Sequence, residues 1–179
     1  MDSRNLLIRE SVFEDGVFFA KWEQSDAVTE YFTMDEGRNY EQVVTEFVRD
    51  RLDPSKKQFT IVLRESNEPI GRIYLSKIDT RCDSLDVTRL YIADPDNRNK
   101  GYGEQALRDI LDYAFINLHM ERVTIDYFVK NKAAAYLYDK IGFKNEGIMR
   151  NAAKKNGKYY DLQLKSMLRA EYYENHHTN

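Results

Sequence analysis

The amino-acid sequence predicts a single α/β domain built around one mixed sheet. Strand-like and helix-like segments follow one another in the order β-α-α-β-β-β-α-β-α-β-β, with no repeats or linkers. Strand 84–93, an amphipathic helix and strand 121–128 form a β-α-β unit, which should be a right-handed parallel crossover inside an otherwise antiparallel sheet. The 179 residues suffice for one core, so we expect residues 1–179 to form one domain.

The first third of the chain predicts one strand and two helices. The strand LLIRES is short, and the two helical segments carry apolar residues at a spacing of three and four, as Val43 and Phe47 show. Pro54 follows the second helix and ends it. The expected elements are strand 6–11, helix 12–24 and helix 40–52.

The middle of the chain predicts three strands. Segments 58–65 and 69–78 are rich in β-branched and aromatic residues and are separated by Ser-Asn-Glu, which indicates a hairpin. Segment 84–93 is apolar on both faces near its end, as expected for a strand that is covered on both sides.

The last third predicts helix, strand, helix and a final hairpin. Helix 103–120 has a continuous apolar face, and helix 132–141 is followed by Gly142, the residue that helix C-caps favour. The remaining elements are strand 121–128 and the strands 142–152 and 157–168, which are joined by a Lys-Lys-Asn-Gly turn.

Composition excludes several classes of function. No apolar run approaches the roughly 18 residues of a membrane span, and the N-terminus lacks the features of a secretory signal, so we expect a cytoplasmic protein. The net charge of -3 argues against general nucleic-acid binding. One cysteine, Cys82, and three histidines, two of them in a tail 172–179 expected to fray, predict neither a metal site nor histidine catalysis.

Two glycines stand one residue apart in the segment Arg-Asn-Lys-Gly-Tyr-Gly, between strand 84–93 and helix 103–120. A tight turn would explain them. A phosphate site would explain them as well, because free N–H groups at a helix N-terminus attract anions, and Gly101 and Gly103 leave room for one. Arg98 and Lys100 would add positive charge.

Taken with a second segment, Asn-Lys-Ala-Ala-Ala-Tyr-Leu-Tyr-Asp-Lys-Ile-Gly-Phe, this loop resembles the GNAT superfamily of N-acetyltransferases. The family combines an Arg/Gln-x-x-Gly-x-Gly/Ala loop with an Asn-x-x-Ala-x-x-x-Tyr-x-x-x-Gly-Phe segment, and both patterns are intact here. The matching residues are Arg98, Gly101, Gly103, Asn131, Ala134, Tyr138, Gly142 and Phe143. The stretch 146–168 is similar to the branch that includes ribosomal-protein N-terminal and spermidine acetyltransferases.

The resemblance implies a GNAT-like fold: a mostly antiparallel sheet of about seven strands whose parallel central pair splays to hold acetyl-CoA. It implies that the pantetheine arm pairs with the backbone of strand 84–93, that the glycine loop cradles the pyrophosphate, and that Asn131 contacts pantetheine. The expected acetyl-CoA contacts are Leu90, Tyr91, Ile92, Arg98, Asn99, Lys100, Gly101, Tyr102, Gly103, Asn131 and Ala134.

Tyr138 occupies the family's general-acid position, although a core aromatic with a satisfied hydroxyl is an alternative explanation for any tyrosine. A phenol with a pKa near 10 protonates a thiolate whose acid has a pKa near 8.5 only at a cost of about 2 kcal/mol. We therefore expect Tyr138 to act chiefly by donating a hydrogen bond to the developing sulfur anion.

The acceptor is expected to be a primary amine, and its identity stays open among protein N-termini, polyamines and small amines such as aminoglycosides. Asp86 is a candidate base, although an exposed aspartate at a strand start explains it equally well. In the acidic segment 23–50, Glu30, Asp35 and Glu36 are candidates for attracting a cationic amine. A non-catalytic acyl-CoA-binding or ribosome-associated module is the alternative function, and a homodimer is compatible with the edge strands.

Overall fold

The computed structural model describes residues 5–34 and 38–177. Its strands are β1 (Leu6–Glu10), β2 (Lys57–Leu63), β3 (Glu68–Asp79), β4 (Ser84–Ile92), β5 (Arg122–Phe128), β6 (Lys144–Lys155) and β7 (Lys158–Leu168). Its helices are α1 (Gly16–Trp22), α2 (Asp26–Thr29), α3 (Tyr40–Arg51), α4 (Tyr102–Asp112), α5 (Lys132–Ile141) and α6 (Arg169–His177). The predicted order of elements is confirmed, with α2 and α6 added.

All seven strands form one sheet in the order β1-β2-β3-β4-β5-β7-β6. The pair β4 and β5 is parallel, and the other neighbouring pairs are antiparallel. The parallel pairing is short: it runs from Ser84 opposite Arg122 to Asp86 opposite Thr124, and beyond that point β4 and β5 are no longer paired. The sheet is therefore open in its centre, as the resemblance implied.

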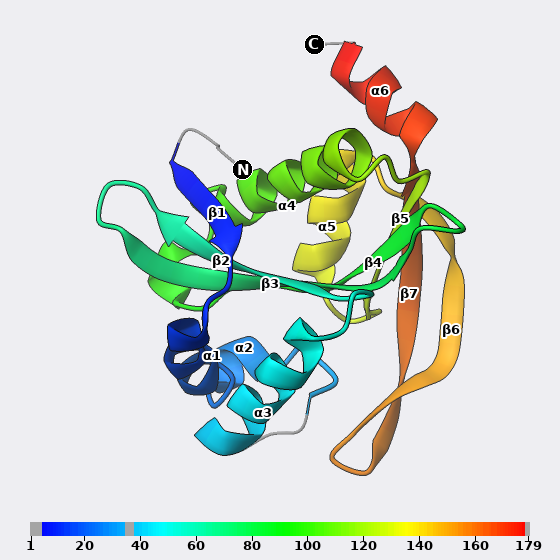
Figure 1. Ribbon diagram of the computed structural model, residues 1–179. Helices are drawn as coiled ribbons and strands as arrows, with labels where there is room; N and C mark the ends of the chain where they lie inside the picture. The colour runs from blue at the N-terminus through cyan, green and yellow to red at the C-terminus, as the bar shows by residue number, and fades with distance from the viewer. Residues whose placement is uncertain (1–4, 35–37, 178–179) are drawn as a thin grey trace.

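Helices cover both faces of the sheet (Figure 1), with α1, α2 and α3 on one side and α4 and α5 on the other. The largest core cluster joins the strands to α4 and α5 through fully buried residues such as Ile61, Leu107 and Phe115. A smaller cluster, which contains Phe19 and Phe47, holds α1 against α3.

A buried network of charged residues ties α1 to the sheet. Glu23, at the C-terminal end of α1, is fully buried and forms an ion pair with Arg72 of β3, which is equally buried. Glu23 also accepts a hydrogen bond from the Tyr91 hydroxyl at 3.2 Å. Tyr91 belongs to β4, so this network fixes the helical layer to the strand that borders the central opening.

The C-terminal tail differs from the expectation. Residues 169–177 form α6 instead of fraying, because Tyr172 is buried against Phe115, with 4.8 Å between ring centroids, and donates a hydrogen bond to Asp112 at 2.6 Å. The predicted helix 103–120 is also shorter than expected, since α4 ends at Asp112 and a π-helical turn follows.

Two predicted turn features are confirmed. Gly142 caps α5 with a φ of 106°, and the turn between β6 and β7 places Asn156 and Gly157 at φ values of 50° and 75°. Both hairpin values are positive, as a type I′ turn requires.

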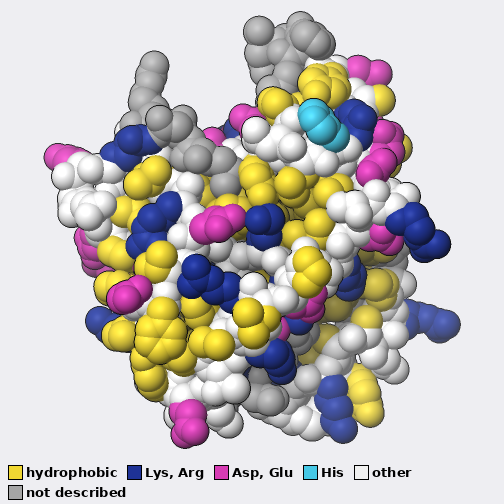
Figure 2. Space-filling view, in the orientation of Figure 1, with side chains coloured by type: hydrophobic (Ala, Val, Ile, Leu, Met, Phe, Trp, Pro, Cys, Tyr) yellow, Lys and Arg dark blue, Asp and Glu magenta, His cyan; other side chains and the backbone are white. Residues whose placement is uncertain are grey.

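Across the described residues, none of the helices is long and apolar enough to cross a membrane. On the face seen in Figure 2, basic and acidic side chains are interspersed and form no single charged surface.

Candidate active site

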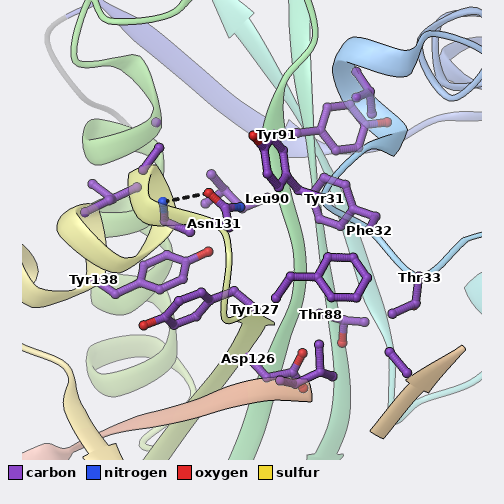
Figure 3. Close-up of a pocket in the computed structure, with 18 of the residues that line it drawn as sticks. Tyr31, Phe32, Thr33, Thr88, Leu90, Tyr91, Asp126, Tyr127, Asn131 and Tyr138 are labelled. Carbon is purple, nitrogen blue, oxygen red and sulfur yellow. Dashed lines mark hydrogen bonds between the residues drawn. The ribbon is translucent and has the colours of Figure 1, made fainter. Parts of the chain in front are cut away.

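A cavity of about 560 Å³ lies where β4 and β5 separate. Its walls come from β3, β4, β5, α5, the segment after α2 and the β6–β7 hairpin. Figure 3 shows Tyr138 and Asn131 on one side of this cavity and Tyr31 and Phe32 on the other. The cavity therefore joins the predicted cofactor side of the sheet to the helical layer that holds the acidic segment.

One edge of β4 is available to a ligand along this cavity. The other edge pairs with β3 as far as Ile92 opposite Gly71, whereas pairing with β5 ends at Asp86. From residue 87 to residue 92, the edge that faces β5 thus has no strand partner among the described residues. A ligand that carries amide groups can add here as an extra strand, which is the arrangement expected for the pantetheine arm.

The N-terminus of α4 is built to accept an anion. Gly101 caps it with a φ of 80°, and the first hydrogen bond of the helix runs from Gln105 N to Gly101 O. The N–H groups of the preceding helical residues thus point out of the helix. A side chain at Gly103 would meet nothing within 4 Å, so the protein itself does not require glycine there. Both features fit a phosphate that comes close to the backbone.

Arg98 makes structural contacts that the sequence did not predict. Its guanidinium donates hydrogen bonds to backbone carbonyls of Ile92 at 3.1 Å, Ala93 at 3.3 Å and Ala27 at 2.7 Å. These carbonyls belong to the end of β4 and to α2, so Arg98 joins the glycine loop to the helical layer. Its Nε and Nη2 atoms therefore bind the protein backbone, and its side chain borders the cavity.

The structure brings most of the predicted cofactor residues together. The predicted residues that line the cavity are Leu90, Tyr91, Ile92, Arg98, Asn99, Gly103, Asn131, Ala134 and the predicted catalytic Tyr138. Lys100, Gly101 and Tyr102 do not line it. Lys100 is exposed, and its ammonium lies 3.4 Å from the Asn97 side chain.

Asn131 and Tyr138 are positioned by α5. The Asn131 carboxamide oxygen accepts a hydrogen bond from Ala134 N at 3.1 Å, which makes Asn131 the N-cap of this helix. The Tyr138 ring packs against Tyr127 and Phe143, with centroid distances of 5.4 Å and 5.9 Å. Its hydroxyl faces the cavity in Figure 3 and has no hydrogen-bond partner among the described residues.

Burial raises the pKa of the Tyr138 phenol, and the neighbouring carboxylates add to this shift. The hydroxyl therefore keeps its proton at neutral pH and can donate a hydrogen bond into the cavity. Tyr138 also belongs to the main core cluster, and among the described residues no side chain or backbone group satisfies its hydroxyl.

Asp86 is buried, so the expectation of an exposed strand-start aspartate was wrong. Its two carboxylate oxygens accept hydrogen bonds from Thr88 and Thr124, both at 2.8 Å. Ser76 lies 2.6 Å from the Thr88 hydroxyl, and because the single Thr88 proton goes to Asp86, Ser76 is the donor to Thr88. The Asp86 carboxyl group is thus held in place by hydroxyl groups at the base of the opening.

Asp126 provides a second carboxylate on the same face. It follows Thr124 by two residues on β5, and Thr124 pairs with Asp86, so all three side chains point to one side of the sheet. No described residue forms a hydrogen bond or an ion pair with Asp126, which borders the cavity. Burial raises its pKa, the Asp86 charge raises it further, and Lys77 opposes both.

The sequence analysis missed Asp126. The available signal was an aspartate in the middle of a strand predicted to be central, where a charged residue is costly without a function.

Of the three acidic residues expected to attract the amine, Glu30 does not line this cavity. Glu30 is exposed and borders a separate, smaller cavity that Asp26, Lys130 and Lys155 also line. Asp35 and Glu36 lie outside the described residues. The carboxylates that line the central cavity are, among described residues, Asp86 and Asp126.

Comparison with known proteins agrees with this geometry. The family described as "Acetyltransferase (GNAT) domain" matches residues 14–164. The uncharacterized N-acetyltransferase p20 of Bacillus licheniformis is 23% identical over 173 residues, which cover 95% of this chain and 96% of that protein. The spermidine N(1)-acetyltransferase of Vibrio cholerae is 28% identical over 120 residues, with 67% of this chain and 68% of that protein covered.

Solved structures show the same fold. The crystal structure of spermidine N-acetyltransferase from Vibrio cholerae in complex with CoA and spermine superposes with a TM-score of 0.87 at 21% identity. The superposition covers 96% of this chain and 99% of the other. At this identity the likeness concerns the fold.

Proposed function

Because the chain belongs to the GNAT acetyltransferase family and is an acetyl-CoA-dependent N-acetyltransferase, we propose that it acetylates a small aliphatic primary amine. The observation that carries this proposal is the carboxyl group of Asp126, which has no partner among the described residues, beside the carboxyl group of Asp86 at the base of the cavity. The aromatic wall formed by Tyr31 and Phe32 would cover the carbon chain of such an amine.

The carboxylate pair addresses the main difficulty of the reaction. An alkylamine with a pKa near 10.4 is neutral in only about one molecule in 2,500 at pH 7, and only the neutral form attacks a thioester. Asp86 would hold the arriving ammonium, and Asp126 would take its proton, directly or through one water. The raised pKa of Asp126 makes it a better proton acceptor than an ordinary aspartate.

The acetyl transfer then forms one bond and breaks another. The amine nitrogen attacks the thioester carbonyl carbon, the carbon–sulfur bond breaks, and the sulfur leaves with the electron pair. The nitrogen then loses its extra proton, and the thiolate takes up a proton to give coenzyme A. Tyr138 would donate its hydroxyl hydrogen bond to this sulfur. Because burial keeps the phenol protonated, stabilisation of the thiolate accounts for its role better than complete proton transfer.

A coenzyme A release assay tests the proposal. The panel contains spermidine, monoamines, diamines, amino acids, aminoglycosides and peptides with different first residues, and binding of acetyl-CoA is followed separately by thermal stabilisation. We expect acetyl-CoA to stabilise the protein and at least one small amine to release coenzyme A. Turnover with peptides alone would contradict the small-amine proposal, and stabilisation without turnover of any amine would favour the non-catalytic module.

A further inference from the structure

Lys77 lies in an irregular part of β3 beside the carboxylate pair. The ladder between β3 and β4 is regular at Ser76 opposite Asp86, is interrupted, and resumes at Asp79 opposite Ser84. Within the interruption Lys77 has a φ of 53°, in the left-handed region that lysine seldom adopts. Strand irregularities of this kind redirect side chains and are frequent beside active sites.

The consequence of this geometry is that Lys77 lines the cavity that holds Asp126. The two side chains are close enough for the lysine charge to affect the titration of the carboxyl group. Lys77 nevertheless forms no ion pair or hydrogen bond within residues 5–34 and 38–177. The exposed side chain of Lys77, a cation without a partner among the described residues, therefore borders the space in which an acceptor amine would lie.

The remaining charges of the cavity do not balance Lys77. Arg98 is engaged with backbone carbonyls, and Lys154, at the hairpin side of the cavity, is another cation, whose ammonium lies 5.3 Å from the centre of the Tyr159 ring. The carboxylates that line the cavity in the described chain are Asp86 and Asp126, the pair assigned to the reacting amine. A second ammonium on the acceptor would therefore meet positive charge.

We propose that Lys77 selects acceptors that carry an anionic group in addition to the amine. The substrate class is then a small amino acid whose amine lies at Asp86 and Asp126 and whose carboxylate pairs with Lys77. A polyamine, with a second cation in place of the carboxylate, is disfavoured. The cavity of about 560 Å³ must also hold the end of acetyl-CoA, which restricts the acceptor to a small molecule. This inference rests on the proposed acetylation of a small amine.

Three amines of equal chain length test the proposal: 4-aminobutyrate, butylamine and 1,4-diaminobutane. They present an anionic, a neutral and a cationic second group to the cavity. We expect kcat/KM for 4-aminobutyrate to exceed the value for 1,4-diaminobutane at least tenfold. Lys77→Gln should remove most of this preference, and Lys77→Glu should reverse it. The preference is the ratio of the two kcat/KM values measured on the same enzyme. A general loss of activity in a variant lowers both values equally and leaves the ratio unchanged.

Lys158→Gln is the matched control, since Lys158 is an exposed lysine of the β6–β7 hairpin that does not line the cavity. It should keep the wild-type ratio. A wild-type preference for 1,4-diaminobutane, or a ratio that Lys77→Glu leaves unchanged, would overturn the role of Lys77 while leaving small-amine acetylation intact. Coenzyme A release with none of the three amines, together with release by peptides, would overturn both proposals.

Discussion

Replacing Tyr138 by phenylalanine isolates the contribution of one hydroxyl group. The ring contacts with Tyr127 and Phe143, at 5.4 Å and 5.9 Å, are available to phenylalanine as well. The hydroxyl has no partner within the described residues, so its removal leaves no buried group unsatisfied. We therefore expect the free energy of unfolding to change by less than about 0.5 kcal/mol.

The effect on turnover should be much larger. A donor directed at charge that develops in the transition state contributes about 2.7 to 4 kcal/mol, or a factor of about 10² to 10³ in kcat. Burial raises the pKa of this phenol, so it stays a donor throughout the pH range of the assay. We expect Tyr138→Phe to lower kcat by this factor while the thermal stabilisation by acetyl-CoA is retained.

The assay is coenzyme A release at saturating acetyl-CoA and acceptor. Tyr136→Phe is the matched control, because Tyr136 lies on the same helix and is 72% exposed. The control should keep wild-type turnover. A kcat within twofold of wild type for Tyr138→Phe, in the absence of a burst that reveals slow product release, would refute the assignment of Tyr138.

Two further predictions concern the phosphate site and the buried charge network. Gly103→Val should weaken acetyl-CoA binding at least tenfold in a titration without lowering the Tm of the free protein, because a Cβ atom at this position meets nothing within 4 Å. Unchanged affinity would place the phosphate elsewhere. Glu23→Gln should lower the free energy of unfolding by about 3 to 5 kcal/mol in urea, because it leaves the Arg72 guanidinium buried without its counter-charge; a loss below about 1 kcal/mol would contradict this reasoning.

Local sequence signals predicted the elements that carry strong chemical constraints. The helix ends at Asn131 and Gly142 and the Asn156–Gly157 turn were correct because each depends on a backbone conformation that few residues favour. The opening between β4 and β5 was available only through the family resemblance, since strand periodicity carries no information about where two parallel strands separate.

Tertiary contacts explain what the sequence did not predict. The tail 172–179 has little amphipathic character, yet α6 forms because one residue, Tyr172, finds a site against Phe115 and Asp112. Arg98 was expected to face a phosphate, and its interaction with Ala27 O depends on a helix far away in the sequence.

The proximity of Asp86 and Asp126 could not be predicted from the sequence either. Asp86 and Asp126 come together only because Asp86 pairs opposite Thr124 in the parallel crossover, so their joint role follows from register and not from spacing along the chain. Similarly, the position of Lys77 depends on an interruption of the β3–β4 ladder that no residue pattern announced.

If Asp126 takes the proton of the acceptor amine, the ionisation of Asp126 should control kcat/KM for the amine, and the pH dependence of kcat/KM measures this control. Burial and the Asp86 charge raise the pKa of Asp126, so the wild-type profile should rise along an acid limb above the ordinary aspartate value near 3.9. Asp126→Asn should remove this limb and lower kcat/KM at pH 7 by about 10² to 10⁴.

The Asp126→Asn variant should lose activity without losing stability. Because the folded-state pKa of Asp126 is raised, its ionisation costs stability as pH increases through that range, and asparagine removes the cost. We therefore predict that Asp126→Asn is nearly inactive, lacks the acid limb and has a Tm at pH 7 at least equal to that of wild type. An Asp126→Asn enzyme that keeps the wild-type acid limb and rate would show that Asp126 is not the proton acceptor.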